Sequence, residues 1–369
     1  MRRALRPVWA VLALLCLRMC TMSVANSKDQ PSLRTFRGAV HVHSSASHDA
    51  QQSAETIAHD AHEAGLDFVV LTDHDQKNGE PRYIENVLIV PEVERSLERG
   101  HVLALGGNAP AEDVRKSRDP WALLDDTHSF LVGAHPDSLK NPLTDEQLAH
   151  VSGYELLSAS SDFYAEARSP AVFFIAAFPF RPLTAFAQLY PDRARGDARF
   201  DRLSKTRELA LFCGTDDHGW SQQPARLQTY ETYVPAFFPE HDARRDADLL
   251  RAALARGESA CVLGIFGDAS PLSVTVKSAA GVATFGAHVS LPASLVVKWN
   301  GEKPQGHHYF VTKDGEPWYD SEGTEFNLIL AEAGVYRLEV ERTTPGFWFF
   351  NRHVRWIYGN PVWVAPGSA

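Results

Sequence analysis

Six short apolar runs within the first 220 residues begin or end in histidine, aspartate or glutamate. Apolar runs of this length, bounded by glycine, proline or aspartate, indicate buried strands of a parallel sheet. They occupy residues 39–43, 69–74, 89–94, 101–106, 131–135 and 211–218. When the ends of several parallel strands each carry such a side chain, the simplest arrangement is a barrel mouth lined with polar groups.

Helical patterns alternate with these runs from residue 36 to about residue 268, which predicts an α/β fold. The clearest helix is predicted over residues 53–65. There Ser53 can cap the first turn, and Gly65 can end the last turn in the left-handed conformation. A second helix is predicted over residues 246–257.

The pattern changes after residue 268. Asn300-Gly301 and Asp314-Gly315 are dipeptides typical of hairpin turns, and each lies close to short alternating runs. Residues 334–341 alternate with a period of two, as a half-buried antiparallel strand does. We therefore predict two domains, an α/β domain over residues 36–268 and a small all-β sandwich over residues 269–369.

Residues 1–25 have the features of an export signal peptide. Three arginines within the first six residues precede an apolar core at residues 8–17, and small residues precede a cleavage site after Ala25. The core is shorter than the roughly 20 apolar residues of a membrane span; an uncleaved anchor is the alternative. Residues 26–35 are polar and are interpreted as a linker. We expect a periplasmic or secreted protein without a stable membrane span.

The charge balance limits the class of partner. The chain has 36 lysines and arginines against 46 aspartates and glutamates, a net charge of −10. The predicted signal peptide holds four of the arginines and no acid, so the mature chain is more acidic still. This excess argues against a nucleic-acid groove. It is compatible with a small-molecule ester substrate, even a phosphorylated one, because bound divalent cations would dominate the local field. The oligomeric state is left open.

Only two cysteines, Cys213 and Cys261, remain after the predicted cleavage. Two cysteines can pair in an oxidising compartment. The sequence does not show that these two meet, so we interpret both as small buried apolar residues, with a disulfide as the alternative.

The first polar-ended run contains His41-Val42-His43. Side chains two apart on a strand share a face, so both imidazoles can chelate one ion. A single His-x-His occurs often by chance, but further candidate ligands follow it along the chain. They are His74, Glu94, His101, His135, Asp216 and His218. Imidazole and carboxylate are ligand types that suit zinc, manganese and iron.

This succession of motifs resembles the polymerase-and-histidinol-phosphatase (PHP) superfamily of metal-dependent hydrolases over about residues 36–220. The resemblance is carried by the His-x-His motif, the Pro-x-Val-Glu segment ending at Glu94, His101 before an apolar strand, and three further segments, 64–74, 134–136 and 214–218. It implies a distorted seven-stranded β/α (TIM-like) barrel with up to three metal ions at its mouth. Residues 356–364 resemble the last strand of exported members in the carbaryl-hydrolase-like branch.

The resemblance also implies a ligand layout. The first ion would be held by His41, His43, Glu94 and Asp216. Glu94 would bridge to a second ion, which also takes His101 and His135. A third ion would be held by His74, His218 and one residue of the pair His48 and Asp49, of which we favour Asp49.

Four neighbouring residues have less certain roles. Glu92 stands where the family usually has glycine, and it could crowd the second ion or add a ligand. Asp73 is expected to support the fold or orient a metal-binding histidine. Asp217 is a candidate proton shuttle or simply an aspartate that anchors its loop. Arg181 is a candidate for binding substrate phosphate, with an ordinary surface arginine as the alternative.

Clustered divalent ions lower the pKa of a bound water to about 7 and so provide hydroxide at neutral pH. We therefore expect an exported hydrolase that uses two or three ions of zinc, manganese or iron against a small phosphate ester. One alternative is hydrolysis of a carboxyl ester or carbamate at the same metal site. A second alternative is a non-catalytic metal-binding module that recognises a partner.

Overall fold

The computed structural model describes most of the chain. The described residues are 35–107, 114–125, 128–159, 191–219, 223–235, 240–302, 306–345 and 351–367. The predicted signal peptide, nearly all of the predicted linker, and Arg181 lie outside these residues.

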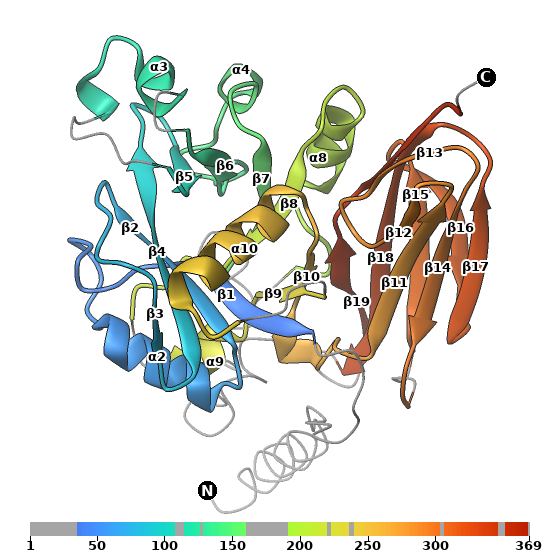
Figure 1. The fold of residues 1–369 in the computed structure, drawn as a ribbon, viewed down its shortest axis with the longest axis horizontal. Coiled ribbons are helices and arrows are strands. Elements are labelled where there is room, and N and C mark those ends of the chain that lie inside the picture. The colour runs from blue at the N-terminus through green and yellow to red at the C-terminus, as the bar shows by residue number, and fades with distance from the viewer. Residues whose placement is uncertain are drawn as a thin grey trace, which may run out of the picture.

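The part of the chain before residue 268 is a mixed α/β body (Figure 1). Its strands are β1 (Phe36–Val42), β2 (Phe68–His74), β3 (Arg82–Ile84), β4 (Val87–Ser96), β5 (His101–Leu105), β6 (Phe130–Ala134), β7 (Gly153–Ser158), β8 (Ala210–Gly214), β9 (Glu231–Val234) and β10 (Ala260–Val262). Its α-helices are α2 (Ala54–Glu63), α3 (Pro120–Asp125), α4 (Asp145–Leu148), α8 (Asp197–Ser204), α9 (Gln223–Leu227) and α10 (Ala243–Ala255).

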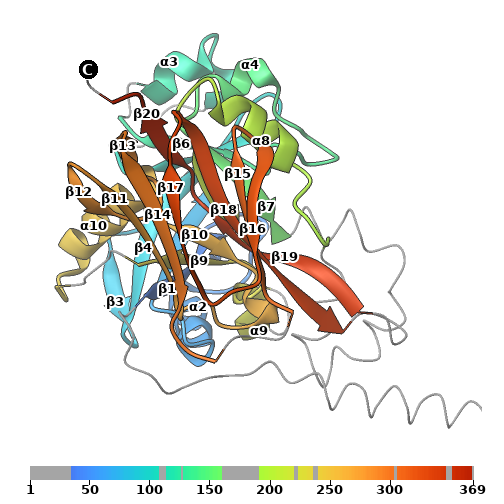
Figure 2. The same cartoon turned by 90° about the vertical axis from the view of Figure 1, so that its right-hand side faces the viewer.

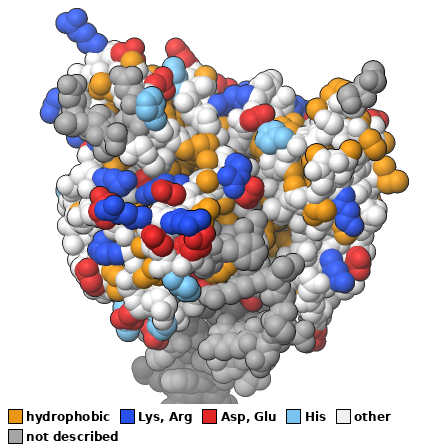
Figure 3. All heavy atoms as spheres, in the orientation of Figure 1, with side chains coloured by type: hydrophobic (Ala, Val, Ile, Leu, Met, Phe, Trp, Pro, Cys, Tyr) orange, Lys and Arg blue, Asp and Glu red, His pale blue; other side chains and the backbone are white. Residues whose placement is uncertain are grey.

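Both predicted helices form. The Ser53 side chain accepts a hydrogen bond from the Thr56 amide at the start of α2, and Gly65 adopts a φ of 72° just beyond its end. Helix α10 begins three residues earlier than predicted, because Asp242 caps it by accepting from two backbone amides of its first turn. Acidic and basic side chains are interspersed over the face of the molecule that α10 occupies (Figure 3).

The strands of the body pair in the order β1-β2-β4-β5-β6-β7-β8. All neighbours in this series are parallel except that β5 is antiparallel to both β4 and β6. The prediction of a parallel strand is therefore wrong for β5. The reason is the four-residue connection Leu97–Gly100, which is closed by a hydrogen bond from the Leu97 amide to the Gly100 carbonyl. So short a connection can only reverse the chain, since a parallel crossover needs a dozen or more residues.

The two faces of these strands pack against different helices. One face contributes alternate residues such as Val40, Val70 and Val90 to a core that includes Leu250 of α10. The opposite face packs on α2 through Ile57 and its neighbours. Burial on both faces explains why these strands are continuous apolar runs.

Strand β8 returns to β1 at the end of this series. The Thr215 amide donates to the Val40 carbonyl, and the His43 amide donates to the Asp217 carbonyl. The regular ladder nevertheless follows an open path, in which β9 and then β10 continue from the other edge of β1. The closed seven-stranded barrel therefore stays a prediction.

The chain after residue 268 adds a second, four-stranded sheet, in the order β12-β11-β14-β17, which lies against a continuation of the first sheet (Figure 2). Trp299 and Trp356 meet between the two layers with ring centroids 5.7 Å apart. The strands are β11 (Leu272–Ser278), β12 (Gly281–Ala283), β13 (His288–Ser290), β14 (Ala293–Trp299), β15 (His308–Lys313), β16 (Glu316–Ser321), β17 (Glu325–Leu330), β18 (Gly334–Pro345), β19 (Asn351–Gly359) and β20 (Val362–Ala365). We call residues 269–367 the β-domain.

One of the two predicted hairpin turns forms. Asp314-Gly315 joins β15 to β16, and both residues have positive φ as the tight turn requires. Asn300-Gly301 does not make a hairpin, because β14 and β15 belong to different sheets. The Asn300 amide instead donates to the carbonyl of Pro271, so the chain leaves one layer and enters the other.

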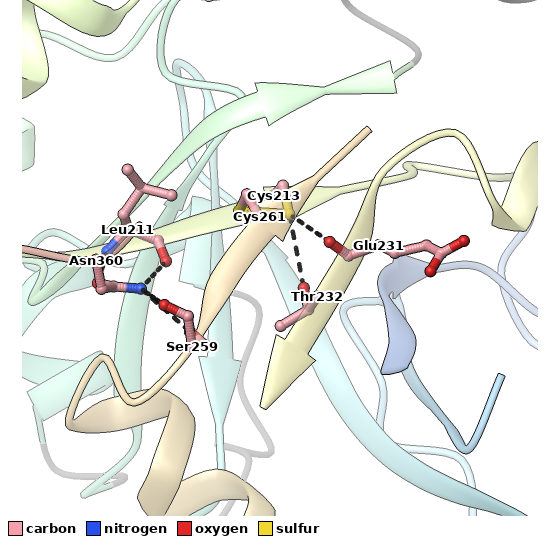
Figure 4. Close-up of a disulfide and its surroundings, with 7 residues drawn as sticks. All are labelled: Leu211, Cys213, Glu231, Thr232, Ser259, Cys261 and Asn360. Atoms are coloured by element: carbon pink, nitrogen blue, oxygen red, sulfur yellow. Dashed lines mark hydrogen bonds between the residues drawn. A yellow bond between two sulfur atoms is a disulfide. The ribbon is translucent and has the colours of Figure 1, made fainter. Parts of the chain in front are cut away.

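The body and the β-domain share one continuous sheet, because β10 pairs with β9 on one side and with β19 on the other. A disulfide between Cys213 and Cys261 links β8 to β10 (Figure 4), with Cα atoms 5.7 Å apart. The interpretation of these cysteines as unpaired is therefore wrong. Sequence alone could not place them together, since they are 48 residues apart. Among the described residues, no helix is long and apolar enough to cross a membrane.

The side chain of Asn360 completes the connection between the two parts. Its oxygen accepts from the Leu211 amide at 2.6 Å, and its Nδ2 donates to the carbonyls of Leu211 and Ser259 at 2.9 and 3.1 Å. All three residues are buried. The asparagine thus acts as a piece of strand beside β8 (Figure 4).

Replacing Asn360 with alanine should lower the free energy of unfolding by about 1–3 kcal/mol, because buried backbone groups of Leu211 lose their partner. Asn327→Ala is the matched control, since Asn327 is exposed on β17, and it should change the stability by less than about 0.5 kcal/mol. Denaturant unfolding of both variants measures the difference. Equal stabilities would contradict a structural role for Asn360.

Candidate metal centre

Glu94 lies at the middle of the candidate metal centre. It ends the inward-facing series of β4 residues, and its side chain is 1% exposed. Its Oε2 atom is 3.3 Å from each of three imidazole nitrogens, the Nε2 atoms of His41 and His43 and the Nδ1 atom of His74. These histidines come from β1 and β2, the two strands that precede β4 in the sheet.

The other oxygen of Glu94 faces two more histidines. Its Oε1 atom is 2.9 Å from Nδ1 of His101 and 3.2 Å from Nε2 of His135. His101 begins its strand, whereas His135 follows the end of β6. Because β5 runs antiparallel, its beginning lies at the same edge as the ends of its parallel neighbours. One carboxylate thus stands among five imidazoles.

Asp216 adds a second carboxylate just beyond β8. Its Oδ1 atom is 3.5 Å from the Nε2 atoms of both His41 and His43 and 3.8 Å from Nδ1 of His218. The three atoms of His41, His43 and Asp216 lie close enough together to hold one ion. His41 also forms such a group with Glu94 and His135.

A third group contains Asp49. Its Oδ2 atom is 3.5 Å from Nε2 of His74 and 3.4 Å from Nε2 of His218, and His43 completes the group. His48 points away, with a side chain that is 79% exposed. Of the residues predicted to bind metal, the structure therefore brings together all except His48. It differs from the expected layout in adding His43 to the third group.

The backbone is unusual at three of these residues. His41, His135 and Asp216 have φ values of 63°, 30° and 48°, a region that residues other than glycine rarely adopt. At His41 the pairing of β1 with β2 shifts register between Val40 and Val42, which marks a bulge. The simple alternation expected for His-x-His is therefore wrong, because the bulge re-aims His41 toward the centre.

Sequence reasoning missed Glu155. This residue of β7 is 2% exposed, and its Oε1 atom lies 2.7 Å from Nδ1 of His41. Its Oε2 atom accepts a hydrogen bond from the backbone amide of His135 at 2.5 Å. Glu155 therefore fixes the orientation of the His41 ring and the position of His135. The available signal was an acid inside the otherwise apolar run 153–158.

Two residues of the loop after β1 support the histidines from the other side. The Ser47 hydroxyl is 3.1 Å from Nδ1 of His43 and accepts from the His74 amide at 2.9 Å. Asp73 accepts from both the amide and the hydroxyl of Ser44, at 2.6 and 2.8 Å. Asp73 thus supports the fold of this loop, one of the two roles predicted for it.

Glu92 is neither a ligand nor an obstacle. Its carboxylate accepts from the Gly106 amide at 2.7 Å and pairs with the Arg251 guanidinium of α10, with Lys77 Nζ 3.9 Å away. Regular pairing between β4 and β5 ends at Val93, so the Glu92 side chain replaces the missing backbone partner. Arg251 balances its charge.

Asp217 is buried beside Asp216, and its carboxylate pairs with the guanidinium of Arg226 on α9. The Asp217 carbonyl also receives the hydrogen bond that joins β8 to β1. This arrangement favours the loop-anchoring role over the proton shuttle.

The carboxylates and imidazoles strongly shift each other's protonation. Burial raises the pKa of Glu94, but the imidazoles around it, first that of His41, outweigh this effect and hold its pKa well below the usual range. Burial lowers the pKa of His43, but its contacts with Asp216 and Glu94 raise that pKa to about 9. The centre therefore requires cations between its groups, and either protons or metal ions can supply them.

The residues fit divalent ions. The Nε2 atoms of His41 and His43, Nδ1 of His74 and Oε2 of Glu94 are buried and have no hydrogen-bond partner among the described residues. Two ligands that each lie about 2.1 Å from one ion, at octahedral or tetrahedral angles, are roughly 3.0–3.4 Å apart. The nitrogen–oxygen separations of 3.3 Å around Oε2 match this spacing.

No protein-family model matches the chain, and no curated protein matches it. Among solved structures, the chain is similar to a candidate metal-dependent phosphoesterase from Bifidobacterium adolescentis. The two share 16% sequence identity, and the alignment covers 49% of this chain and 87% of that chain, with a TM-score of 0.29. A TM-score this low does not show a shared fold.

Gly214 offers a test that leaves every candidate ligand in place. A Cβ atom at this position would overlap the Glu155 carboxylate and come 2.8 Å from Cβ of His41. We expect Gly214→Ala to weaken metal binding by about 10- to 100-fold, the usual cost of disturbing a residue that orients a ligand. Metal content after dialysis and calorimetric titration with manganese would measure it. Gly323→Ala, where the nearest atom to the new Cβ is 3.3 Å away, should bind metal like the unmodified protein. Equal metal affinity in the two variants would contradict this role of the Glu155–His41 contact.

Proposed function

We propose that this chain is an exported metal-dependent hydrolase that cleaves a small phosphate ester. The observation that carries the proposal is the placement of five imidazoles around the two oxygens of Glu94, with Asp216 and Asp49 at the edges of the cluster. Export rests on the predicted signal peptide alone.

The ions would be held by three overlapping groups. They are His41, His43 and Asp216; Glu94 with His101 and His135; and His43, Asp49, His74 and His218. Bound zinc, manganese or iron would lower the pKa of water and neutralise charge on the ester. Glu155 and Ser47 would set the ring orientation of His41 and His43, because each contacts the Nδ1 atom of its histidine.

The resemblance to the PHP superfamily supports the same proposal, with a distorted seven-stranded barrel. In the described residues, strands β1, β2, β4, β5, β6 and β8 contribute to one inner core capped by α10. The backbone hydrogen bonds between β8 and β1 bring the two ends of the strand series together.

The surroundings of the centre favour a phosphate ester over a carboxyl ester. A small cavity next to His135 and Glu155 is lined by Asp137, Ser138, Leu139, Leu156, Ser158 and Arg195. An arginine on this wall suits an anionic substrate, whereas a site for aryl esters or carbamates would be expected to present aromatic rings. The described lining holds none. The module without catalysis is disfavoured because the ligand groups are complete.

Purified mature protein, loaded with manganese or zinc, should hydrolyse an aryl phosphomonoester or phosphodiester and leave an aryl acetate and an aryl carbamate intact. His74→Ala and Asp216→Ala should each lower turnover by more than the roughly 100-fold that loss of an orienting residue costs. His62→Ala, on the exposed side of α2, is the matched control and should keep full turnover.

The other outcomes separate the alternatives. Release from the acetate or carbamate alone would assign the protein to carbonyl hydrolysis. No release from any ester would favour the binding module. Full activity in either His74→Ala or Asp216→Ala would remove the metal mechanism.

A further inference from the structure

Residues 191–197 form a loop that passes between the candidate metal centre and the β-domain, just before α8 (Figure 1). The β-domain strand β19 holds this loop by its backbone. The Arg355 amide donates to the Asp192 carbonyl at 2.8 Å, and the Ala194 amide donates to the Tyr358 hydroxyl oxygen at 2.8 Å. The Arg352 side chain adds a bond of 2.7 Å to the Asp192 carboxylate.

The other side of the loop is held by the body. A Cβ atom at Gly196 would overlap the Asp137 carboxylate and come 2.9 Å from the Tyr154 hydroxyl, so the backbone is packed directly on these groups. Arg199 of α8 reinforces the contact, with NH1 3.1 Å from Oδ1 of Asp137. Positions 192, 194 and 196 are therefore all fixed.

Arg195 lies between these fixed positions and lines the cavity next to His135 and Glu155. Its side chain is exposed, unlike its neighbours Ala194 and Gly196, which are buried. The same cavity wall includes Leu139, which is 71% exposed although it is apolar. The wall thus offers one cation and one apolar surface beside the candidate centre.

We propose that Arg195 binds an anionic oxygen of the substrate's phosphoryl group and that the β-domain, through Tyr358 and Arg355, holds Arg195 in the position to do so. The proposal rests on the proposed function. It defines the substrate as a small phosphate ester with an apolar alcohol group, which Leu139 would contact.

The charges of the site explain why such an arginine is needed. Glu155, Asp137 and the carboxylates of the centre would repel an anionic ester at the cavity wall. A planar guanidinium can pair with two phosphoryl oxygens at once, and such bidentate contacts are the strong, geometrically specific ones. Fixing the backbone on both sides of Arg195 lowers the conformational entropy that ordering the arginine would cost on binding.

The first experiment compares Arg195→Met and Arg195→Lys with the full mature protein, all loaded with manganese. We expect Arg195→Met to lower kcat/KM for an aryl phosphomonoester by about 10- to 100-fold, mainly through KM, and to weaken inhibition by inorganic phosphate by a similar factor. Arg195→Lys should recover part of the loss. Arg202→Met is the control, because Arg202 lies on the same helix region, is exposed and pairs with Asp145.

The second experiment tests positioning. Tyr358→Phe removes only the oxygen that accepts from the Ala194 amide, and it should raise KM several-fold with kcat and metal content unchanged. In the double variant with Arg195→Met, the loss should equal that of Arg195→Met alone, since Tyr358 acts through Arg195. Additive losses would overturn the role of the β-domain.

Calorimetric binding of inorganic phosphate to the manganese-loaded proteins keeps this proposal separate from the proposed function. If the unmodified protein cleaves the ester and Arg195→Met does so equally well, the role of Arg195 is overturned and the proposed function stands. If no ester is cleaved, the proposed function fails. In that case, weaker phosphate binding by Arg195→Met would still support the anion site, and equal phosphate binding would overturn it.

Discussion

The buried carboxylate of Glu94 is the group on which the arrangement of the body depends. An ionised carboxylate removed from water is costly unless positive charge and hydrogen-bond donors surround it. Five imidazoles provide that surrounding, and each comes from a different position along the first 135 residues. The strands must therefore end at one edge of the sheet. This requirement explains why β5 reverses direction while its neighbours stay parallel, since only then does His101 face Glu94.

The same requirement is met at the cost of backbone strain. His41, His135 and Asp216 all have positive φ, and such conformations cost roughly 1–3 kcal/mol each. They persist because neighbouring groups hold them. The Glu155 carboxylate contacts His41 and His135, and the Thr215 hydroxyl donates to the His41 carbonyl at 3.1 Å. The disulfide fixes β8 immediately before the strained segment.

The β-domain belongs to the same structural unit as the body. The sheet is continuous through β10 and β19, and the buried Arg337 of β18 reaches across to α8. Its guanidinium binds the Asp197 carboxylate at 2.5 Å and Asp201 at 2.9 Å, and it pairs with Glu339 of its own strand at 2.7 Å. An arginine so deeply buried needs these carboxylates to offset its desolvation. The helix next to the cavity is thereby tied to the β-domain, which makes the domain a support for the site and not an independent appendage.

The sequence by itself determined the ligand types, most of the ligand positions and the alternation of strands and helices. Local patterns carry this information, because an apolar run that ends in histidine or aspartate specifies a strand with a polar end. Only the tertiary structure decided what depends on contacts between distant segments. These are the reversal of β5, the bulge at His41, the choice of Asp49 over His48, the pairing of Glu92 with Arg251 and the joining of Cys213 to Cys261. Each brings together residues whose proximity no local pattern encodes, since it follows from how the strands are ordered and how buried charges are balanced.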